Sequence, residues 1–483
     1  MNKRAKLSFF FFLTFLSASL FGQTGEALYY MNLPQNHLFN PALRPTNSFY
    51  LGIGITGINA NINNNFFNLS DILIPGRADS IVTFLHPDYD INDFLDKIKQ
   101  NNFLDGKINV QLFGLGFNAG KDMYIFLDIN ERAEADISLP EDLIRICLAG
   151  NENYVGKSLD LKNLDAGLTY FREAGIGFSK MFGKNLRIGA KAKLLFGIAG
   201  FSFDNRNLKL TVGDDYAHAI NADLTANISG PVDFYLDEDN YPDSVVVNDD
   251  ILKSTKFFLN TKNRGFGIDI GAVYNFTQNL SISASITDLG FIRWHDRITN
   301  LKAESTFSFS GFNIKDVVNG TKTFDELADE MLDSLKNSFI VSNDKEPFNT
   351  FLSPEIAIGA SYNITKKFGV GLLSRTHFET GHVRESFTIS ANLNLGNALS
   401  TTLAYTAANH RFDNLGAGLA LRAGIFQFYV ITDRIPLTWN KIISEDNEIP
   451  LPSNWNTLNI RFGLNLVLGN NIKKKTDKPM III

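Results

Sequence analysis

The residues best suited to bind a metal ion gather at His377, Glu379 and His382. Imidazole nitrogens and carboxylate oxygens are ordinary ligands of divalent metals. The spacing is His-x-Glu-x-x-His, which differs from the His-Glu-x-x-His motif of helical zinc hydrolases. It falls at the tip of a short expected hairpin, where residues two apart share a face, so a weak surface metal site is one interpretation. A polar loop is the interpretation we favour, and we expect no metal and no cofactor.

Motifs for covalent or nucleotide chemistry are missing from this sequence. It has no Gly-x-Ser-x-Gly, no phosphate-binding loop and only one cysteine, Cys147. Glycine pairs such as Gly114/Gly116 and Gly175/Gly177 fall within expected strands, which favours packing over nucleotide binding. Acidic runs such as 237–239 lie in a long expected loop and lack the spacing of a calcium-binding loop. The sequence therefore indicates a protein without catalytic residues, which we do not expect to be an enzyme.

The first residues have the pattern of a secretory signal peptide. Lys3, Arg4 and Lys6 precede an apolar run from Leu7 to Leu20, and small residues lead to an expected cleavage site after Gly22. Loss of residues 1–22 removes three basic residues and no acid, so the formal net charge of −6 becomes −9. An acidic exported chain is not expected to bind nucleic acid, which requires a basic face.

Apolar and polar residues alternate with a period of two along much of the chain, which predicts β-strands with one apolar and one polar face. From Ser386 to Leu395, for example, Phe387, Ile389, Ala391, Leu393 and Leu395 alternate with serine, threonine and asparagine. About fourteen strands are predicted: 48–60, 107–118, 122–130, 165–180, 185–203, 264–276, 279–291, 352–364, 367–378, 385–395, 398–408, 414–422, 424–433 and 456–468.

The connections between these strands alternate between tight turns and mostly long loops, such as 61–106, 204–263 and 292–351. Outer-membrane barrels have short periplasmic turns and long external loops, whereas a β-sandwich has no reason to sort its loops in this way. No apolar stretch after the signal peptide is long enough for a spanning helix. The predicted fold class is therefore an all-β transmembrane antiparallel barrel over residues 48–468, followed by a periplasmic tail at 469–483. A secreted β-sandwich adhesin is a less favoured alternative.

Charged residues on the polar faces of the strands predict a wet or ion-paired lumen. The lumen-lining candidates are Arg187, Lys191, Lys193, Asp269 and Arg461. Amphipathic patterns predict helices in the loops at 90–103, 140–148 and 324–339, which would cover apolar loop surface or the barrel mouth.

The segment 23–47, between the signal peptide and the first strand, is apolar and interrupted by prolines, so a strand is not expected there. We expect a plug or a periplasmic segment, with Asn40, Pro41, Ala42 and Leu43 as the plug candidates. These four residues resemble the N-terminal Asn-Pro-Ala box of Bacteroidota-type outer-membrane barrels. Further stretches, 139–144, 149–151, 170–173 and 188–197, resemble a family of unknown function.

That resemblance implies an outer-membrane barrel, distantly similar to the long-chain fatty-acid transporter family and to barrel subunits of type IX secretion and gliding systems. It brings no catalytic residues and no substrate. Such barrels usually end on an aromatic residue, whereas here residues 469–483 follow the last predicted strand.

Two functions remain open at this point. One is a channel or transporter for small or apolar solutes. The alternative is a structural or accessory barrel that docks a surface or secretion-system protein through its loops. In both, outer-membrane lipid surrounds the barrel.

Overall fold

The computed structural model describes residues 26–75, 81–86, 89–214, 217–236, 242–309, 340–342, 345–379, 382–408, 411–436, 439–444, 447–452 and 457–469. The expected signal peptide, residues 1–22, lies outside the described residues, as do residues 470–483 of the expected tail. No helix in the described part of the chain is both long and apolar enough to cross a membrane.

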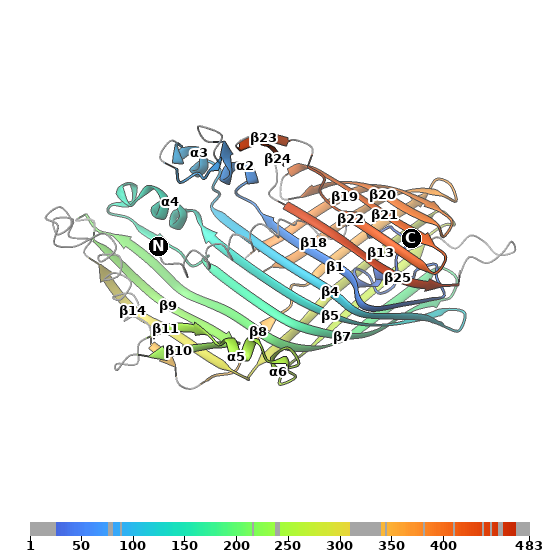
Figure 1. Ribbon diagram of the computed structural model, residues 1–483, viewed down its shortest axis with the longest axis horizontal. Helices are drawn as coiled ribbons and strands as arrows, with labels where there is room; N and C mark the ends of the chain where they lie inside the picture. The colour runs from blue at the N-terminus through green and yellow to red at the C-terminus, as the bar shows by residue number, and fades with distance from the viewer. Residues whose placement is uncertain are drawn as a thin grey trace.

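Fourteen antiparallel strands form one closed barrel (Figure 1). In order around the wall they are β1 (Phe49–Asn64), β4 (Asn101–Ala119), β5 (Met123–Pro140), β7 (Asp165–Phe182), β8 (Leu186–Val212), β12 (Asn263–Asn275), β13 (Leu280–Trp294), β17 (Glu355–Asn363), β18 (Phe368–Glu379), β19 (His382–Leu395), β20 (Leu399–Ala408), β21 (Arg411–Ala423), β22 (Phe426–Thr432) and β25 (Thr457–Leu468). The strand β1 pairs with β4 on one side and with β25 on the other, so the wall has no free edge. The predicted fold class is confirmed, and each predicted strand corresponds to one strand of the barrel.

The apolar faces of the strands point outward. On β19, Phe387 and Ile389 are 59% and 60% exposed, whereas the alternate residues Ser386 and Thr388 are buried. The same alternation recurs on the neighbouring strands, because successive side chains of a strand point to opposite faces. The barrel therefore has an apolar outer surface, and its inner face carries polar side chains together with buried apolar clusters.

The connections sort between the two ends of the barrel. Tight turns join six pairs of strands at one end, and several carry a glycine with positive φ, such as Gly183 (φ 65°) and Gly396 (φ 61°). Long connections lie at the other end, where β8 continues beyond its last pairing with β12 at Gly197 and pairs with β9 (His218–Ser229). The remaining strands there are β2 (Ile74–Pro75), β3 (Ile81–Val82), β6 (Ser158–Asp160), β10 (Val232–Leu236), β11 (Pro242–Val247), β14 (Ile298–Phe309), β15 (Ile340–Ser342), β16 (Phe348–Phe351), β23 (Trp439–Ser444) and β24 (Asn447–Pro452).

Short helices lie in the long connections: α2 (Leu69–Ile72), α3 (Ile91–Leu95), α4 (Glu141–Ala149), the 3-10 helix η2 (Glu152–Tyr154), α5 (Asp249–Leu252) and α6 (Thr255–Phe258). The predicted helix at 140–148 is confirmed as α4, with Pro140 at its N-cap and two acidic residues in its first turn. The predicted helix at 90–103 is wrong beyond α3, because β4 begins at Asn101. There, Phe103 is buried and already belongs to the alternation of that strand. The predicted helix at 324–339 lies outside the described residues.

Candidate functional site

Residues 26–47 run inside the barrel. The segment contains one 3-10 helix, η1 (Pro34–Leu38), and nearly every one of its side chains is buried. Among the described residues, its backbone-to-backbone hydrogen bonds join only its own residues, for example Met31 N to Leu28 O and Asn40 N to Asn36 O. The barrel wall holds it through side chains instead. We call residues 26–47 the internal segment.

The Asn-Pro-Ala box lies against a notch of two glycines in the wall. Gly189 on β8 and Gly271 on β12 are directly paired across the strands. A Cβ on Gly189 would come within 2.2 Å of the carbonyl carbon and oxygen of Pro41, and a Cβ on Gly271 within 2.0 Å of the Asn40 Oδ1. Such approaches are impossible for a side chain, so only glycine lets the box lie this close to the wall.

Hydrogen bonds fix the box in the notch. Asn40 Oδ1 accepts a hydrogen bond from the Ala42 backbone N–H at 2.9 Å, which holds the turn of the box itself. Ser179 Oγ on β7 donates to the Ala42 carbonyl at 2.8 Å, and Ser285 Oγ on β13 donates to the Phe39 carbonyl at 2.8 Å. The box is therefore held from both sides of the two-glycine notch.

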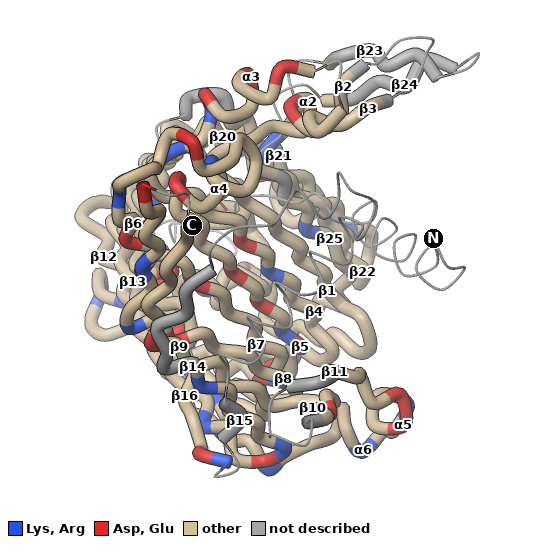
Figure 2. Tube along the Cα trace, turned by 90° about the vertical axis from the view of Figure 1, so that its left-hand side faces the viewer, with Lys and Arg blue, Asp and Glu red and all other residues tan. Residues whose placement is uncertain are grey.

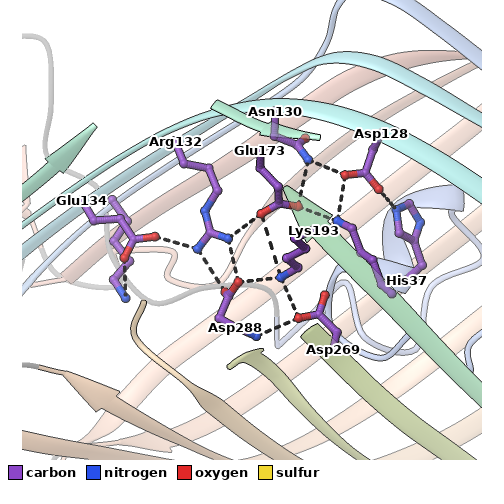
Figure 3. Close-up of polar contacts among 11 residues, drawn as sticks. His37, Asp128, Asn130, Arg132, Glu134, Glu173, Lys193, Asp269 and Asp288 are labelled. Atoms are coloured by element: carbon purple, nitrogen blue, oxygen red, sulfur yellow. Dashed lines mark hydrogen bonds and ion pairs between the residues drawn. The ribbon is translucent and has the colours of Figure 1, made fainter. Parts of the chain in front are cut away.

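A buried ionic network covers the inner wall over five neighbouring strands, from β5 to β13 (Figure 3). Lys191 Nζ lies 2.7 Å from Asp128 Oδ1 and 2.6 Å from Glu173 Oε1. Lys193 Nζ lies 2.6 Å from both Asp269 Oδ1 and Asp288 Oδ1. The charged residues of this part of the wall lie close together in space (Figure 2). Mutual pairing is what makes their burial tolerable, because an unpaired charge in this position would be strongly unfavourable.

Arg132 joins the two halves of the network. Its guanidinium binds both carboxylate oxygens of Asp288, at 2.7 and 3.0 Å, and also binds Glu173 at 2.9 Å and Glu134 at 2.6 Å. Asp288 sits at a break in the β12–β13 register and has a positive φ of 59°. Its backbone N–H donates to Asp269 Oδ1 at 2.8 Å. Under the regular alternation of β13, the Asp288 side chain would point away from the network. The irregularity turns its carboxylate inward, to the centre of the network.

The internal segment is joined to this network through His37 of η1. The His37 Nδ1 lies 2.7 Å from the Pro34 carbonyl oxygen, and Nε2 lies 3.1 Å from Asp128 Oδ2. Both ring nitrogens therefore have an oxygen partner, one within η1 and one on the barrel wall. The ring also packs on Phe126 at a centroid distance of 4.3 Å.

The beginning of the internal segment meets a second ionic group. Glu26 lies 3.2 Å from Arg375 Nη1 on β18, and Arg375 binds both oxygens of Glu355 on β17 at 2.6 Å. Burial raises the pKa of the Glu26 carboxyl to about 7, against the opposing effect of Arg375. Phe39 lies between two guanidinium groups, with Arg375 5.0 Å and Arg461 4.9 Å from its ring centre.

The structure places all five lumen-lining candidates on the inner face, and all five are buried. Lys191, Lys193 and Asp269 come together in the ionic network. Arg187 lies apart, nearer the turn end of β8, where it donates to Ser179 Oγ at 3.3 Å. Arg461 lies apart as well, on β25 against Phe39. The plug candidates Asn40, Pro41, Ala42 and Leu43 lie within the internal segment.

The three residues of the metal-like group contact three different side chains. His377 Nδ1 lies 3.5 Å from Glu355, Glu379 binds Lys107 at 2.8 Å, and His382 Nε2 lies 3.2 Å from Asp105. No cluster of metal-ligating side chains occurs in the residues that the structure describes.

Several members of the site were not predicted from the sequence, chiefly Asp128, Arg132, Glu173 and Asp288. The first two lie on the same face of β5, four residues apart, so charged residues at even spacing along one strand were a usable signal. No such signal exists for Asp288, since its inward position depends on the register break.

The fold and the site together define a closed fourteen-strand barrel with an internal N-terminal segment. The chain belongs to the family of unknown function DUF5723, whose model matches residues 41–433. No curated protein matches its sequence.

Several solved barrel structures are similar to it. The ΔS2 mutant of the monoaromatic hydrocarbon channel TodX has a TM-score of 0.40 at 9% identity, with 92% of this chain and 96% of that chain covered. The toluene transporter TodX of Pseudomonas putida has a TM-score of 0.36 at 8% identity, covering 93% and 98%. A FadL homologue of Pseudomonas aeruginosa has a TM-score of 0.38 at 9% identity, covering 91% and 95%.

Proposed function

We propose that this protein is a channel of the bacterial outer membrane, and that the internal segment closes its lumen in the resting state. The apolar outer surface supports the membrane location. Residues such as Phe387, Leu403 and Phe428 are 58–59% exposed on the outer face and would be unfavourable in water but not in lipid. A closed barrel also satisfies every backbone polar group of its wall within the membrane.

The observation that carries the proposal is the way in which the internal segment is held. It contributes no strand to the barrel, and its attachments are side-chain hydrogen bonds, ion pairs, the two-glycine notch and apolar contacts with wall residues such as Leu373 and Tyr429. Its release would therefore break no strand pairing of the wall. The backbone hydrogen bonds between the wall strands do not depend on the internal segment. The barrel can therefore stay closed around an open lumen when the segment leaves, and such a lumen can act as a passage.

The inner wall carries many polar groups that suit a small hydrophilic solute. Its inward-facing residues include three hydroxyl-bearing side chains in succession on β13, namely Ser281, Ser283 and Ser285, and three on β19, namely Ser386, Thr388 and Ser390. The charged network adds fixed charges of both signs. Selectivity in such passages follows the width of the pore and the groups that line it.

The test combines location and conductance. The full chain and a variant lacking residues 26–47 are expressed, fractionated and compared on gels with and without boiling. Both should appear in the outer membrane as bands that shift on heating. In planar bilayers the deletion variant should conduct and the full chain should remain largely closed.

A soluble band without a heat shift would refute the membrane barrel. Two heat-modifiable proteins that both fail to conduct would refute the channel. The remaining interpretation would then be an accessory barrel that docks a surface or secretion partner through its long loops.

A further inference from the structure

Two opposite walls of the barrel touch near the end that carries the long loops. Six strands separate β4 from β18 in each direction around the ring: β5, β7, β8, β12, β13 and β17 on one side, and β1, β25, β22, β21, β20 and β19 on the other. The two strands are therefore diametrically opposed. Even so, Lys107 Nζ on β4 lies 2.8 Å from Glu379 Oε2 on β18.

The contact involves three successive inward-facing residues of β4. Besides Lys107, Asp105 lies 3.5 Å from Arg384 Nη1 and 3.2 Å from His382 Nε2 on β19. Phe103 stacks on the His382 ring at a centroid distance of 4.0 Å and an interplanar angle of 12°. We call these residues of β4, together with Glu379, His382 and Arg384, the cross-lumen strut.

Burial distinguishes the strut from an incidental surface contact. The side chains of Asp105, Glu379 and Arg384 are only 1–2% exposed, and Arg384 binds both Asp105 and Glu379. Two buried carboxylates thus face two cations, Lys107 and Arg384, across the lumen. A barrel of this strand number is wide when circular, so contact between opposite walls requires a flattened cross-section at this level.

The strut lies beyond the internal segment and is separate from it. On β18 the inward-facing positions Arg375, His377 and Glu379 follow one another toward the loop end. Arg375 binds Glu26 of the internal segment, whereas Glu379 belongs to the strut. Release of the internal segment therefore leaves all the contacts of the strut in place.

We propose that the cross-lumen strut sets the size limit of the channel by dividing its outer mouth into two narrow openings. This inference rests on the proposed function, since a size limit has meaning only for a passage. The residues that decide it are Lys107 and Arg384, because their loss leaves Asp105 and Glu379 as like charges that repel one another across the lumen. The two openings would then merge into one.

The experiment uses the full chain in planar bilayers, with the internal segment loosened by the substitution Gly189→Ala in the two-glycine notch. In that background, Lys107→Ser with Arg384→Ser breaks the strut, and Lys107→Arg with Arg384→Lys keeps its charges. A matched control is Glu131→Gln, which breaks the pair of Glu131 and Arg172 on the directly adjacent strands β5 and β7. Heat-modifiable migration establishes that each variant is folded.

Unit conductance and the largest poly(ethylene glycol) that enters the pore are measured for each protein. Breaking the strut should raise unit conductance by about twofold and admit larger polymers, because conduction follows the width of the narrowest passage. The charge-keeping variant and Glu131→Gln should behave like their parent.

Conductance that appears on loosening the segment but is the same with and without the strut would overturn the strut inference alone. The same substitutions are also made in the chain that lacks residues 26–47, and absence of conductance in all of these folded proteins would refute the proposed function, and the size limit with it.

Discussion

The substitution Gly189→Ala tests whether the internal segment is held by the two-glycine notch. The new Cβ would stand 2.2 Å from the Pro41 carbonyl carbon and oxygen and 2.3 Å from the Ala42 nitrogen, all of them backbone atoms that cannot rotate away. Overpacking of this kind costs about 1–3 kcal/mol. If the strain is relieved by release of the segment, the released fraction should rise by roughly 5- to 150-fold.

The assay follows the segment directly and does not depend on conduction. Met31 of the segment is 1% exposed and is replaced by cysteine, after the exposed Cys147 has been replaced by serine. The rate of maleimide labelling then reports how often the segment leaves the wall. Labelling should be slow in the parent and faster in Gly189→Ala by the stated factor.

The matched control is Gly267→Ala on β12, another inward-facing glycine. Its Cβ would lie 3.4 Å from Lys193 Cδ, the far part of a flexible side chain, and should be tolerated. An equal labelling rate in all three proteins, or an equal increase in both glycine variants, would refute the role of the notch.

Three further predictions concern buried groups. In a denaturation measurement, Lys191→Met should lower the free energy of unfolding by about 3–5 kcal/mol, because two buried carboxylates lose their cation. The control is Lys162→Met, since the side chains of Lys162 and its partner Asp160 are 66% and 51% exposed. It should lower the free energy of unfolding by under about 1 kcal/mol. The pKa of Glu26 is raised to about 7, so protonation of this carboxyl stabilises the internal segment in its place inside the barrel. This stabilisation is complete below about pH 4.5 and is lost as the pH rises through 7. Bilayer open probability should therefore be higher at pH 8 than at pH 5, and a Glu26→Gln variant that keeps the same difference would contradict this assignment. Phe39→Leu removes two cation–π contacts and should make release of the internal segment more favourable by about 0.5–2 kcal/mol. The rate of maleimide labelling at Met31→Cys should rise accordingly, and an unchanged rate would exclude such a contribution.

The fold could be predicted from the sequence because its signals are local. Each strand carries its own alternation, and each tight turn carries its own turn residues, so about fourteen strands could be placed without knowing their partners. The error at 90–103 arose where an amphipathic helical spacing overlapped the start of β4. Residues such as Phe103 satisfy both periods, and only pairing with β5 decides between them.

The candidate site could be predicted only in part. Charged residues such as Lys191 and Asp269 reveal themselves by standing on the polar face of a strand. Their partners do not, because an ion pair across strands depends on register and on the neighbouring strand. The bulge that brings Asp288 to Lys193 and Arg132 is a departure from the very regularity on which the prediction rests.

By itself, then, the sequence determined the strands, the sorting of short and long connections, and the presence of an apolar segment that is not a strand. Alternation is the same for a sandwich and for a barrel, so the strands alone did not decide which face points inward, and the inward polar face was predicted only from the sorting of the loops. Closure of β1 onto β25 decided that question by turning the polar faces onto one enclosed space. The same closure brought Lys107 to Glu379 and Gly189 to Pro41. Residues so far apart in the chain meet only when the circumference and the stagger of the whole ring are fixed, and no local pattern contains that information.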